Sequence, residues 1–464
     1  MATATAAPAS PLPVSERTAV PTRRLIVYAL PWFFVQVVNL PLVNFVPGYY
    51  ASDLGVPLLQ VSFVLLIGRF LDIFTDPLIG TLSDRTRTRF GRRKPWIAAG
   101  VPILMAGAWL LFAPPPDAGA LYLFGAVTVA YLGFTMIQIS FVAWGAELST
   151  DYQGRTRVAG WREGVGIVGT LTAIAAPLIA LTLGYEGLGP AMFGIAVGVL
   201  ILAPLLAAPA LLFVPEPPPA DLVETRLAFW DGLKLIRKNR AFLIFAAGIA
   251  IMFVGVAPGG ATGYLMMKHS FDAEALYPYL VFGEWVMTFF CLPFWLWLSG
   301  RIGKHIALVI GLVWVSAFTI TVPLMIGTVD PYWIVILSTC RGMAFGALFV
   351  IPYSMFADLI DADTLATGKQ RSGLYMAFGG MILKFALMLG VALALAWPDW
   401  FGFDAASDTN DASGEFHVAV SYAWISVAFW LASVPFFLSY PLTKARQRAL
   451  RAELEAAGAE PAVP

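Results

Sequence analysis

Charged residues are scarce in this chain of 464 residues: Asp, Glu, Lys and Arg together make up 12%, whereas apolar residues make up 59%. An ordinary soluble domain is about 25% charged. Most of a chain so poor in charge cannot face water, so the composition excludes a soluble protein and indicates the lipid bilayer as a partner. The formal net charge is zero, and without a basic excess nothing points to nucleic acid.

Cysteine is almost absent as well. Cys291 and Cys340 both lie in apolar runs without a partner at metal-ligand spacing, so we expect buried packing residues and no disulfide framework or metal site. The sequence also lacks G-x-x-x-x-G-K-[ST], H-E-x-x-H and G-x-S-x-G motifs, which argues against ATP-driven pumping and intramembrane hydrolysis. We therefore expect neither an enzyme nor a bound cofactor.

Long apolar runs are what the chain has in abundance. A membrane-spanning helix needs about 20 predominantly apolar residues. The runs that meet this length are 25–46, 58–82, 96–113, 120–148, 163–184, 190–214, 241–266, 276–298, 305–327, 331–358, 372–397 and 417–440. The breaks between them carry Pro, Gly or charge. The sequence therefore predicts an all-α membrane protein with twelve transmembrane helices.

Cations gather in alternate loops. Segments 83–95, 149–162 and 215–240 are rich in Lys and Arg, whereas the intervening loops are acidic, with Lys268 as their one cation. Lys and Arg concentrate in cytoplasmic loops, so we expect both termini in the cytoplasm and a multi-pass protein of the plasma (inner) membrane. Residues 1–22 lack the apolar core of a signal peptide and are expected to form a disordered tail.

The two halves of the chain echo each other. Pro77, Ser83 and Arg85 recur 216 residues later as Pro293, Ser299 and Arg301, and Glu147 has a counterpart in Asp358. Two six-helix halves joined by a long loop are typical of secondary transporters, which bind substrate near mid-membrane between the halves. The predicted segments are an N-terminal tail 1–22, a first half 23–214, a central loop 215–240, a second half 241–441 and a C-terminal tail 442–464.

Charged residues inside the predicted spans are the candidates for function, because burying a charge in hydrocarbon is costly unless it is paired or lines a wet cavity. Arg69, Asp72 and Asp76 fall within roughly 60° of one another on one helix face. Lys384, in the eleventh span, needs an anion, and the two aspartates are best placed to supply it. One Lys cannot neutralise two acids, so we favour a site whose net charge changes during transport over a permanent structural ion pair.

Three further features remain open or structural. Glu284 is either a second coupling acid or a water-facing residue, and Arg341 is expected to be structural, with a partner such as Glu284. Glu147, Arg162 and Glu163 are candidates for a lock between helices at the inner face. The G-x-G-x-x-G match at 164–169 has no strand before it, so it indicates close helix packing through small residues rather than dinucleotide binding.

The segment after the second predicted span carries GTLSDR at 80–85 and GRR at 91–93. These motifs resemble the signature loop between the second and third spans of the major facilitator superfamily. Together with RxxDxxxDP at 69–77 and KPW at 94–96, they resemble the glycoside–pentoside–hexuronide:cation symporter family. The resemblance extends to spans 10 and 11 and implies the major facilitator fold, with two pseudo-symmetric six-helix halves.

The resemblance also implies roles for individual residues. Asp72 and Asp76 would bind the coupling cation, Lys384 and Arg69 would balance charge beside the substrate, and Arg162 would contact the substrate. The residues implied for the cytoplasmic gate or loop are Asp84, Arg85, Arg92 and Arg93.

The chain departs from the family pattern in its fourth span, where Gln138 stands in place of an acid that serves both substrate and cation. The first span offers only amides, including Gln36 and Asn39. An amide hydrogen-bonds hydroxyls but adds no charge to a cation site. Trp144 offers a ring face to a sugar. We expect these four residues in the substrate site, and H⁺ slightly ahead of Na⁺ as the coupling ion, because two carboxylates make a thin cage for Na⁺.

These features together predict a monomeric secondary transporter that works by alternating access. It would couple H⁺ or Na⁺ to symport of a glycoside, hexuronide or related hydroxylated small molecule. A carrier of an amphipathic or lysolipid-like solute is the alternative within transport, since the family includes lysolipid carriers. A sensor that binds ligand without translocating it is the alternative from another class, although we expect no signalling domain after Tyr440.

Overall fold

The computed structural model describes residues 20–149, 152–216, 237, 239–367, 372–407 and 409–442. The predicted N-terminal tail, central loop and C-terminal tail lie almost entirely outside these described residues. The described chain is helical, apart from a single bridge between Thr88 and Gly91. The predicted all-α fold class is confirmed.

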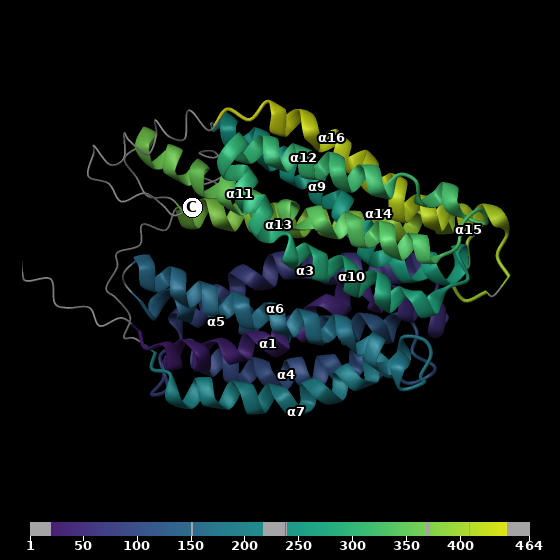
Figure 1. Ribbon diagram of the computed structural model, residues 1–464. Helices are drawn as coiled ribbons and strands as arrows, with labels where there is room; N and C mark the ends of the chain where they lie inside the picture. Colours follow the sequence, from purple (N-terminus) through teal and green to yellow (C-terminus); the bar gives the residue numbers. More distant parts are fainter. Residues whose placement is uncertain are drawn as a thin grey trace, which may run out of the picture.

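Figure 1 shows two helical bundles lying side by side. The first bundle contains α1 (Thr22–Asn44), α2 (Val46–Gly48), the π-helix η1 (Tyr49–Asp53), α3 (Leu58–Arg85), α4 (Lys94–Phe112), α5 (Ala120–Glu147), α6 (Tyr152–Thr182) and α7 (Gly189–Phe213). The second contains α9 (Arg240–Leu265), η2 (Met266–Ser270), η3 (Glu274–Leu276), α10 (Tyr277–Phe290), α11 (Leu292–Ile302), α12 (Lys304–Thr319), η4 (Val322–Met325), α13 (Tyr332–Thr367), α14 (Ser372–Trp400), α15 (Ala412–Val420), η5 (Ser421–Ile425) and α16 (Ser426–Leu438).

The number of membrane-spanning helices agrees with the prediction once one broken span is included. Within the described residues, eleven helices are long and apolar enough to cross a membrane, and α10 with α11 forms a twelfth that bends by 46°. The bend falls at Cys291, just before Pro293, whose ring removes a backbone donor at the start of α11. Cys291 and Cys340 are both free and half-buried.

Two helices extend beyond the apolar runs that predicted them. α6 begins at Tyr152 rather than near residue 163, and α13 continues to Thr367 rather than ending near residue 358. An apolar run reports the thickness of hydrocarbon that a helix crosses, whereas backbone hydrogen bonds continue wherever the polar residues that follow also favour a helix. The predicted loop 149–162 is therefore mostly helix where it is described.

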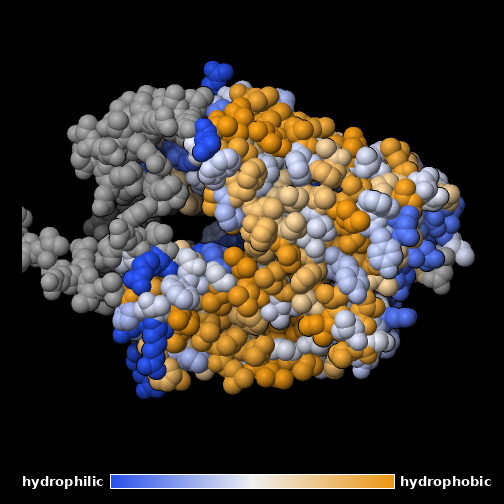
Figure 2. All heavy atoms as spheres, in the orientation of Figure 1, coloured by the Kyte–Doolittle hydropathy of each residue, from blue (hydrophilic) through white to orange (hydrophobic). Residues whose placement is uncertain are grey.

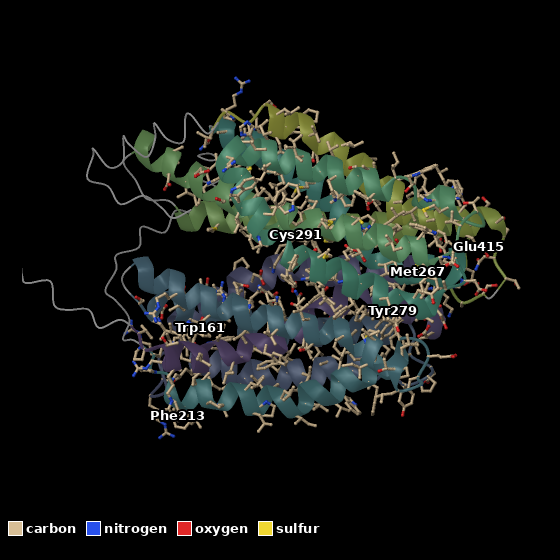
Figure 3. All side chains as sticks on the ribbon, in the orientation of Figure 1. Trp161, Phe213, Met267, Tyr279, Cys291 and Glu415 are labelled. Atoms are coloured by element: carbon tan, nitrogen blue, oxygen red, sulfur yellow. The ribbon has the colours of Figure 1, made fainter. Side chains whose placement is uncertain are left out.

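The outer surface carries the pattern of a membrane protein. Figure 2 shows hydrophobic side chains along the flanks and hydrophilic ones gathered at the two ends. We call the end that carries Arg85 to Arg93 the basic end, and the end that carries Asp53, Asp272 and Glu415 the acidic end. In Figure 3, Trp161 and Phe213 lie toward the basic end and Met267 and Glu415 toward the acidic end.

Small residues bring the helices close together inside the bundles. A Cβ added at Gly169 on α6 would lie 2.3 Å from the carbonyl oxygen of Phe33 on α1, a distance that real atoms do not tolerate. The glycine-rich segment 164–169 therefore packs α6 against α1, as the sequence predicts. Between the bundles, α3 packs against α14 and α6 packs against α10.

Candidate functional site

The two bundles are joined at the acidic end by side chains from both. Tyr264 on α9 donates a hydrogen bond to Asp53 Oδ1 at 3.2 Å, and Lys268 Nζ donates to Ser52 Oγ at 2.7 Å. Tyr277 donates to the backbone oxygen of Asn44 at 3.2 Å. These contacts close the molecule at this end.

The basic end differs, because the ion pairs found there among the described residues each stay within one bundle. Arg93 Nη2 lies 2.5 Å from Asp84 Oδ1, and Arg92 Nη2 lies 2.7 Å from Glu147 Oε1, all in the first bundle. Lys304 and Asp358 form an ion pair of 2.6 Å within the second. Figure 2 shows a hollow between the bundles on this side. The structure is therefore closed at the acidic end and hollowed toward the basic end.

A cavity of about 490 Å³ lies between the bundles. The first bundle contributes polar groups to its wall, including the predicted substrate residues Gln36 and Asn39, with Glu163 and Thr170 from α6. The second bundle contributes an acid, an arginine and several aromatic rings: Glu284, Arg341, Tyr277, Trp285, Phe289, Phe345, Phe349 and Tyr353. The site therefore combines hydrogen-bonding groups with broad apolar faces.

The charged stripe on α3 meets its partner across the boundary between the bundles. Asp76 Oδ2 accepts a hydrogen bond from Lys384 Nζ on α14. Asp72 is 2% exposed and lies 3.5 Å from Arg69 Nη1, while the guanidinium of Arg69 lies 4.4 Å from the ring centre of Tyr131. The two acids therefore have different partners: Lys384 pairs with Asp76, whereas Asp72 pairs with Arg69 in its own helix.

Packing on both sides of α3 fixes the position of these charges. A Cβ at Gly68 would lie 2.8 Å from Val127 on α5, so the glycine allows the close contact between α3 and α5. On the other side, Ser62 donates to the backbone oxygen of Ala392 on α14 at 3.1 Å. The stripe is thus held between a helix of its own bundle and a helix of the other.

Thr135 on α5 is a further candidate for this group that the sequence does not predict. Its Oγ1 and the Oδ1 of Asp76 are buried and have no hydrogen-bond partner among the described residues. Gly68 lies beside Tyr131 and Gly80 beside Ile139, so this helix register brings Thr135 level with Asp76. Buried unpaired oxygens are costly and call for a ligand. A threonine among many buried residues carries no signal in sequence that would distinguish it.

The family model for MFS/sugar transport proteins matches residues 27–444. The chain belongs to this family. The resemblance to the glycoside–pentoside–hexuronide:cation symporters is thereby confirmed, and the protein is a multi-pass membrane transporter, not an enzyme.

The relatives of this transporter are named for different solutes. The sodium-dependent lysophosphatidylcholine symporter 1 of Xenopus tropicalis is 23% identical, over 90% of this chain and 84% of the relative. YagG of Escherichia coli (strain K12), whose name assigns it to glycoside/cation symport, is 24% identical, over 88% of this chain and 90% of YagG. The crystal structure of the nucleoside transporter NupG matches with a TM-score of 0.65 at 14% identity, covering 89% of this chain and 98% of NupG. This structural likeness shows the major facilitator fold.

The other predicted residues of the transporter lie apart from the charged stripe. Arg162 forms an ion pair of 2.7 Å with Glu163 and lies 5.3 Å from the ring centre of Trp32. Glu147 pairs with Arg92 and Arg93 instead. The lock predicted between Glu147, Arg162 and Glu163 is not formed in this structure, because Glu147 pairs with the arginines that precede α4 and Arg162 pairs with Glu163 within α6.

Two of the predicted substrate residues, Trp144 and Gln138, are not among the residues that line the cavity. Trp144 is fully buried, with its indole donating to the Pro215 oxygen at 3.3 Å and its ring edge-on to Tyr28. It therefore presents no face to the cavity, and its stacking role is set aside. Gln138 is half-buried on α5 and is not among the residues that line the cavity.

The signature loop of the transporter forms a network rather than a free gate. The carboxylate of Glu216 accepts backbone hydrogen bonds from Arg92 at 2.8 Å and Arg93 at 2.9 Å. Gly91 has a φ of +105°, and a Cβ there would lie 2.1 Å from Glu216 Oε2, so glycine is required at this turn. Asp84, Arg92 and Arg93 join this network, whereas Arg85 is exposed.

Proposed function

We propose that this protein is a cation-coupled symporter in which Asp72 and Asp76 hold the coupling ion. The observation that carries the proposal is the ion pair between Asp76 and Lys384, which joins α3 of one bundle to α14 of the other. A cation at Asp76 competes with Lys384 for the same carboxylate. Ion binding thus weakens a link between the bundles and frees them to move.

The groups around this pair suit either H⁺ or Na⁺ as the coupling ion. Asp72, Asp76 and Thr135 present only oxygen donors, which suit a hard cation such as Na⁺. Gln138 adds no negative charge to the group, so Na⁺ would be held by two carboxylates only. A proton needs a single carboxylate. We propose H⁺ ahead of Na⁺, and either ion satisfies the unpaired Asp76 oxygen.

The proposed cargo is a glycoside, hexuronide or related hydroxylated small molecule. The amides of Gln36 and Asn39 and the hydroxyl of Thr170 face the central cavity and suit hydroxyl groups. Arg162 reaches this wall through its pair with Glu163. The glycoside/cation name of YagG agrees with this cargo.

A second cargo class has a specific observation in its favour. An apolar pocket of about 140 Å³ between α9, α13 and α14 is lined by Phe242, Phe245 and Phe356, and it shares Tyr353 with the central cavity. A solute with a polar head and an apolar chain would fill both. The lysophosphatidylcholine symporter among the relatives makes an amphipathic solute the alternative.

The orientation is part of the proposal. Lys and Arg concentrate in cytoplasmic loops, so we assign the basic end to the cytoplasm and both termini with it, in the plasma (inner) membrane. The structure then corresponds to the state that faces the cytoplasm, with Asp84, Arg92 and Arg93 at its inner rim.

The test is uptake into proteoliposomes under an imposed H⁺ or Na⁺ gradient, with a panel of labelled glycosides, D-glucuronate and lysophosphatidylcholine. D72N and D76N are expected to abolish uphill accumulation, because the ion loses its carboxylates. D117N, an exposed acid in the loop before α5, is the matched control and is expected to accumulate substrate normally. Uphill, ion-dependent uptake by both D72N and D76N would contradict the mechanism, and ligand binding without any accumulation would favour the sensor.

A further inference from the structure

A buried ion pair, separate from that of Asp76 and Lys384, lies in the wall of the central cavity. Glu284 on α10 and Arg341 on α13 are joined through Oε2 and Nη2, and their side chains are only 14% and 4% exposed. The guanidinium lies 4.8 Å from the ring centre of Tyr422 and 5.3 Å from that of Phe345. Arg341 is therefore held by rings on two sides and by an acid on a third.

The backbone around this pair is packed tightly. A Cβ at Gly342 would lie 2.2 Å from the backbone oxygen of Glu284, so α10 and α13 touch at this point. Thr288, one turn along α10, donates to the backbone oxygen of Gly342 at 3.0 Å. The pair therefore lies where two helices of the second bundle are tightly packed.

Stability alone gives little reason for the pair. A buried ion pair often stabilises a fold no better than apolar residues of the same volume, because desolvation offsets the attraction. Arg341 Nε is also buried without a hydrogen-bond partner among the described residues. The pair faces a cavity that a solute must occupy, and its two charges sum to zero.

The neighbouring groups complete a recognisable binding surface. Trp285 follows Glu284, lines the same cavity and stacks on Phe349 with ring centres 6.0 Å apart. Across the cavity lie the amides of Gln36 and Asn39. A carboxylate and a guanidinium accept and donate paired hydrogen bonds to adjacent hydroxyls, and an indole face covers the C–H face of a pyranose ring.

We propose that Glu284, Arg341 and Trp285 form the substrate-recognition site of the second bundle, and that this site selects neutral glycosides over hexuronides. The inference rests on the proposed symport and narrows its cargo. A uronate carboxylate would compete with Glu284 for an arginine that is already neutralised, whereas hydroxyls bind the intact pair. The site is separate from Asp72 and Asp76, so it sets affinity for the cargo and not the coupling to the ion.

The test measures binding of methyl β-D-galactopyranoside, methyl β-D-glucopyranoside, D-glucuronate and lysophosphatidylcholine to the purified full-length protein by calorimetry, at two pH values with and without Na⁺. Wild type is expected to bind a neutral glycoside more tightly than D-glucuronate. E284Q is expected to lose about tenfold or more in affinity, since a charged hydrogen bond contributes about 1.5–3 kcal/mol. The dependence of that affinity on pH and Na⁺ is expected to stay as in wild type. D330N, an exposed acid of the same bundle, is the control.

The double variant E284L/R341M separates recognition from packing. It removes both charges together and keeps apolar volume, so it is expected to retain the wild-type melting temperature and still bind the glycoside poorly. Wild-type affinity in E284L/R341M or in E284Q would overturn the inference, as would a wild type that prefers D-glucuronate or lysophosphatidylcholine or binds no glycoside. Retention of ion-driven uptake in both D72N and D76N would instead overturn the proposed function, whatever the result at Glu284.

Discussion

Two ion pairs within the membrane-spanning helices of this molecule are built differently. Asp76 and Lys384 belong to different bundles, whereas Glu284 and Arg341 belong to the same one. In a pseudo-symmetric fold, the contact between α3 and α14 corresponds to that between α10 and α6. At the contact between α3 and α14, Asp76 pairs with a residue of the other bundle. At the contact between α10 and α6, Glu284 pairs with a residue of its own bundle.

This difference indicates which charges can take part in movement. A pair that crosses between the bundles must break or rearrange when the bundles rock, so its strength sets an equilibrium between states. A pair inside one bundle is carried along unchanged. We therefore associate Asp76 and Lys384 with coupling, and Glu284 and Arg341 with recognition.

Removal of Lys384, one partner of the pair that crosses between the bundles, tests its role in coupling most directly. K384M leaves Asp76 without its cation, and because the two side chains are 24% and 26% exposed, solvent screening reduces the cost below that of a fully buried pair. We expect a drop in melting temperature and loss of uphill uptake. D76N/K384M is expected to recover the melting temperature but not the uptake, measured by thermal unfolding and by proteoliposome transport. Recovery of coupled uptake in the double variant would make the crossing pair merely structural.

Glycines on α3 and α13, the helices that carry Asp76 and Arg341, differ in how tightly they are packed. G342A places a Cβ against backbone at 2.2 Å, whereas G68A meets the end of the Val127 side chain at 2.8 Å. Backbone cannot yield as a side chain does, so G342A is expected to destabilise by about 1–3 kcal/mol and G68A by less. G380A, with no atom within 4 Å, is the control in thermal unfolding. Equal losses of stability in G342A and G68A would contradict tighter packing around Glu284 and Arg341.

The contacts between the two bundles at the acidic end are expected to depend weakly on pH. Burial raises the pKa of Asp53 above its usual value, against the opposing effects of Lys268 and of the hydrogen bond from Tyr264, while Glu274 adds to the rise. Opening this end exposes Asp53 and returns its pKa to the ordinary value. The closed state therefore binds the proton more tightly, so closure is favoured as pH falls through the raised pKa and this gain is absent above it.

Spin-label distances across the acidic end measure this effect. Labels at Tyr185→Cys and Thr328→Cys, both exposed and one in each bundle, in a chain without Cys291 and Cys340, report closure. We expect the short-distance population to rise on acidification, and D53N to remove the part of this rise that Asp53 causes. An unchanged pH response in D53N would assign the effect to another group.

Much of the fold was predictable because hydrocarbon imposes simple rules. The length of each apolar run and the alternation of basic and acidic loops predict twelve spans without reference to any contact. The helices α6 and α13 ran past their predicted ends, because helix geometry continues outside the membrane. The break at Cys291 was likewise invisible in hydropathy.

The site was predictable only in part. Charge inside apolar runs marked Asp72, Asp76 and Lys384, since few residues can account for such a cost. Which acid pairs with Lys384 depends on helix rotation, and the structure assigns Asp76 to it and Arg69 to Asp72. Trp144 lies outside the cavity lining and Thr135 gave no signal in the sequence, because aromatic and small polar residues occur on every face of these helices.

The sequence by itself determined that this chain crosses a membrane many times and carries a few costly charges in its second and eleventh spans, because periodicity and hydropathy are local properties. Tertiary structure alone decided that one ion pair crosses between the bundles while another stays inside one of them. Both pairs join residues far apart in the chain, and only the rotation and contact of packed helices bring such residues together.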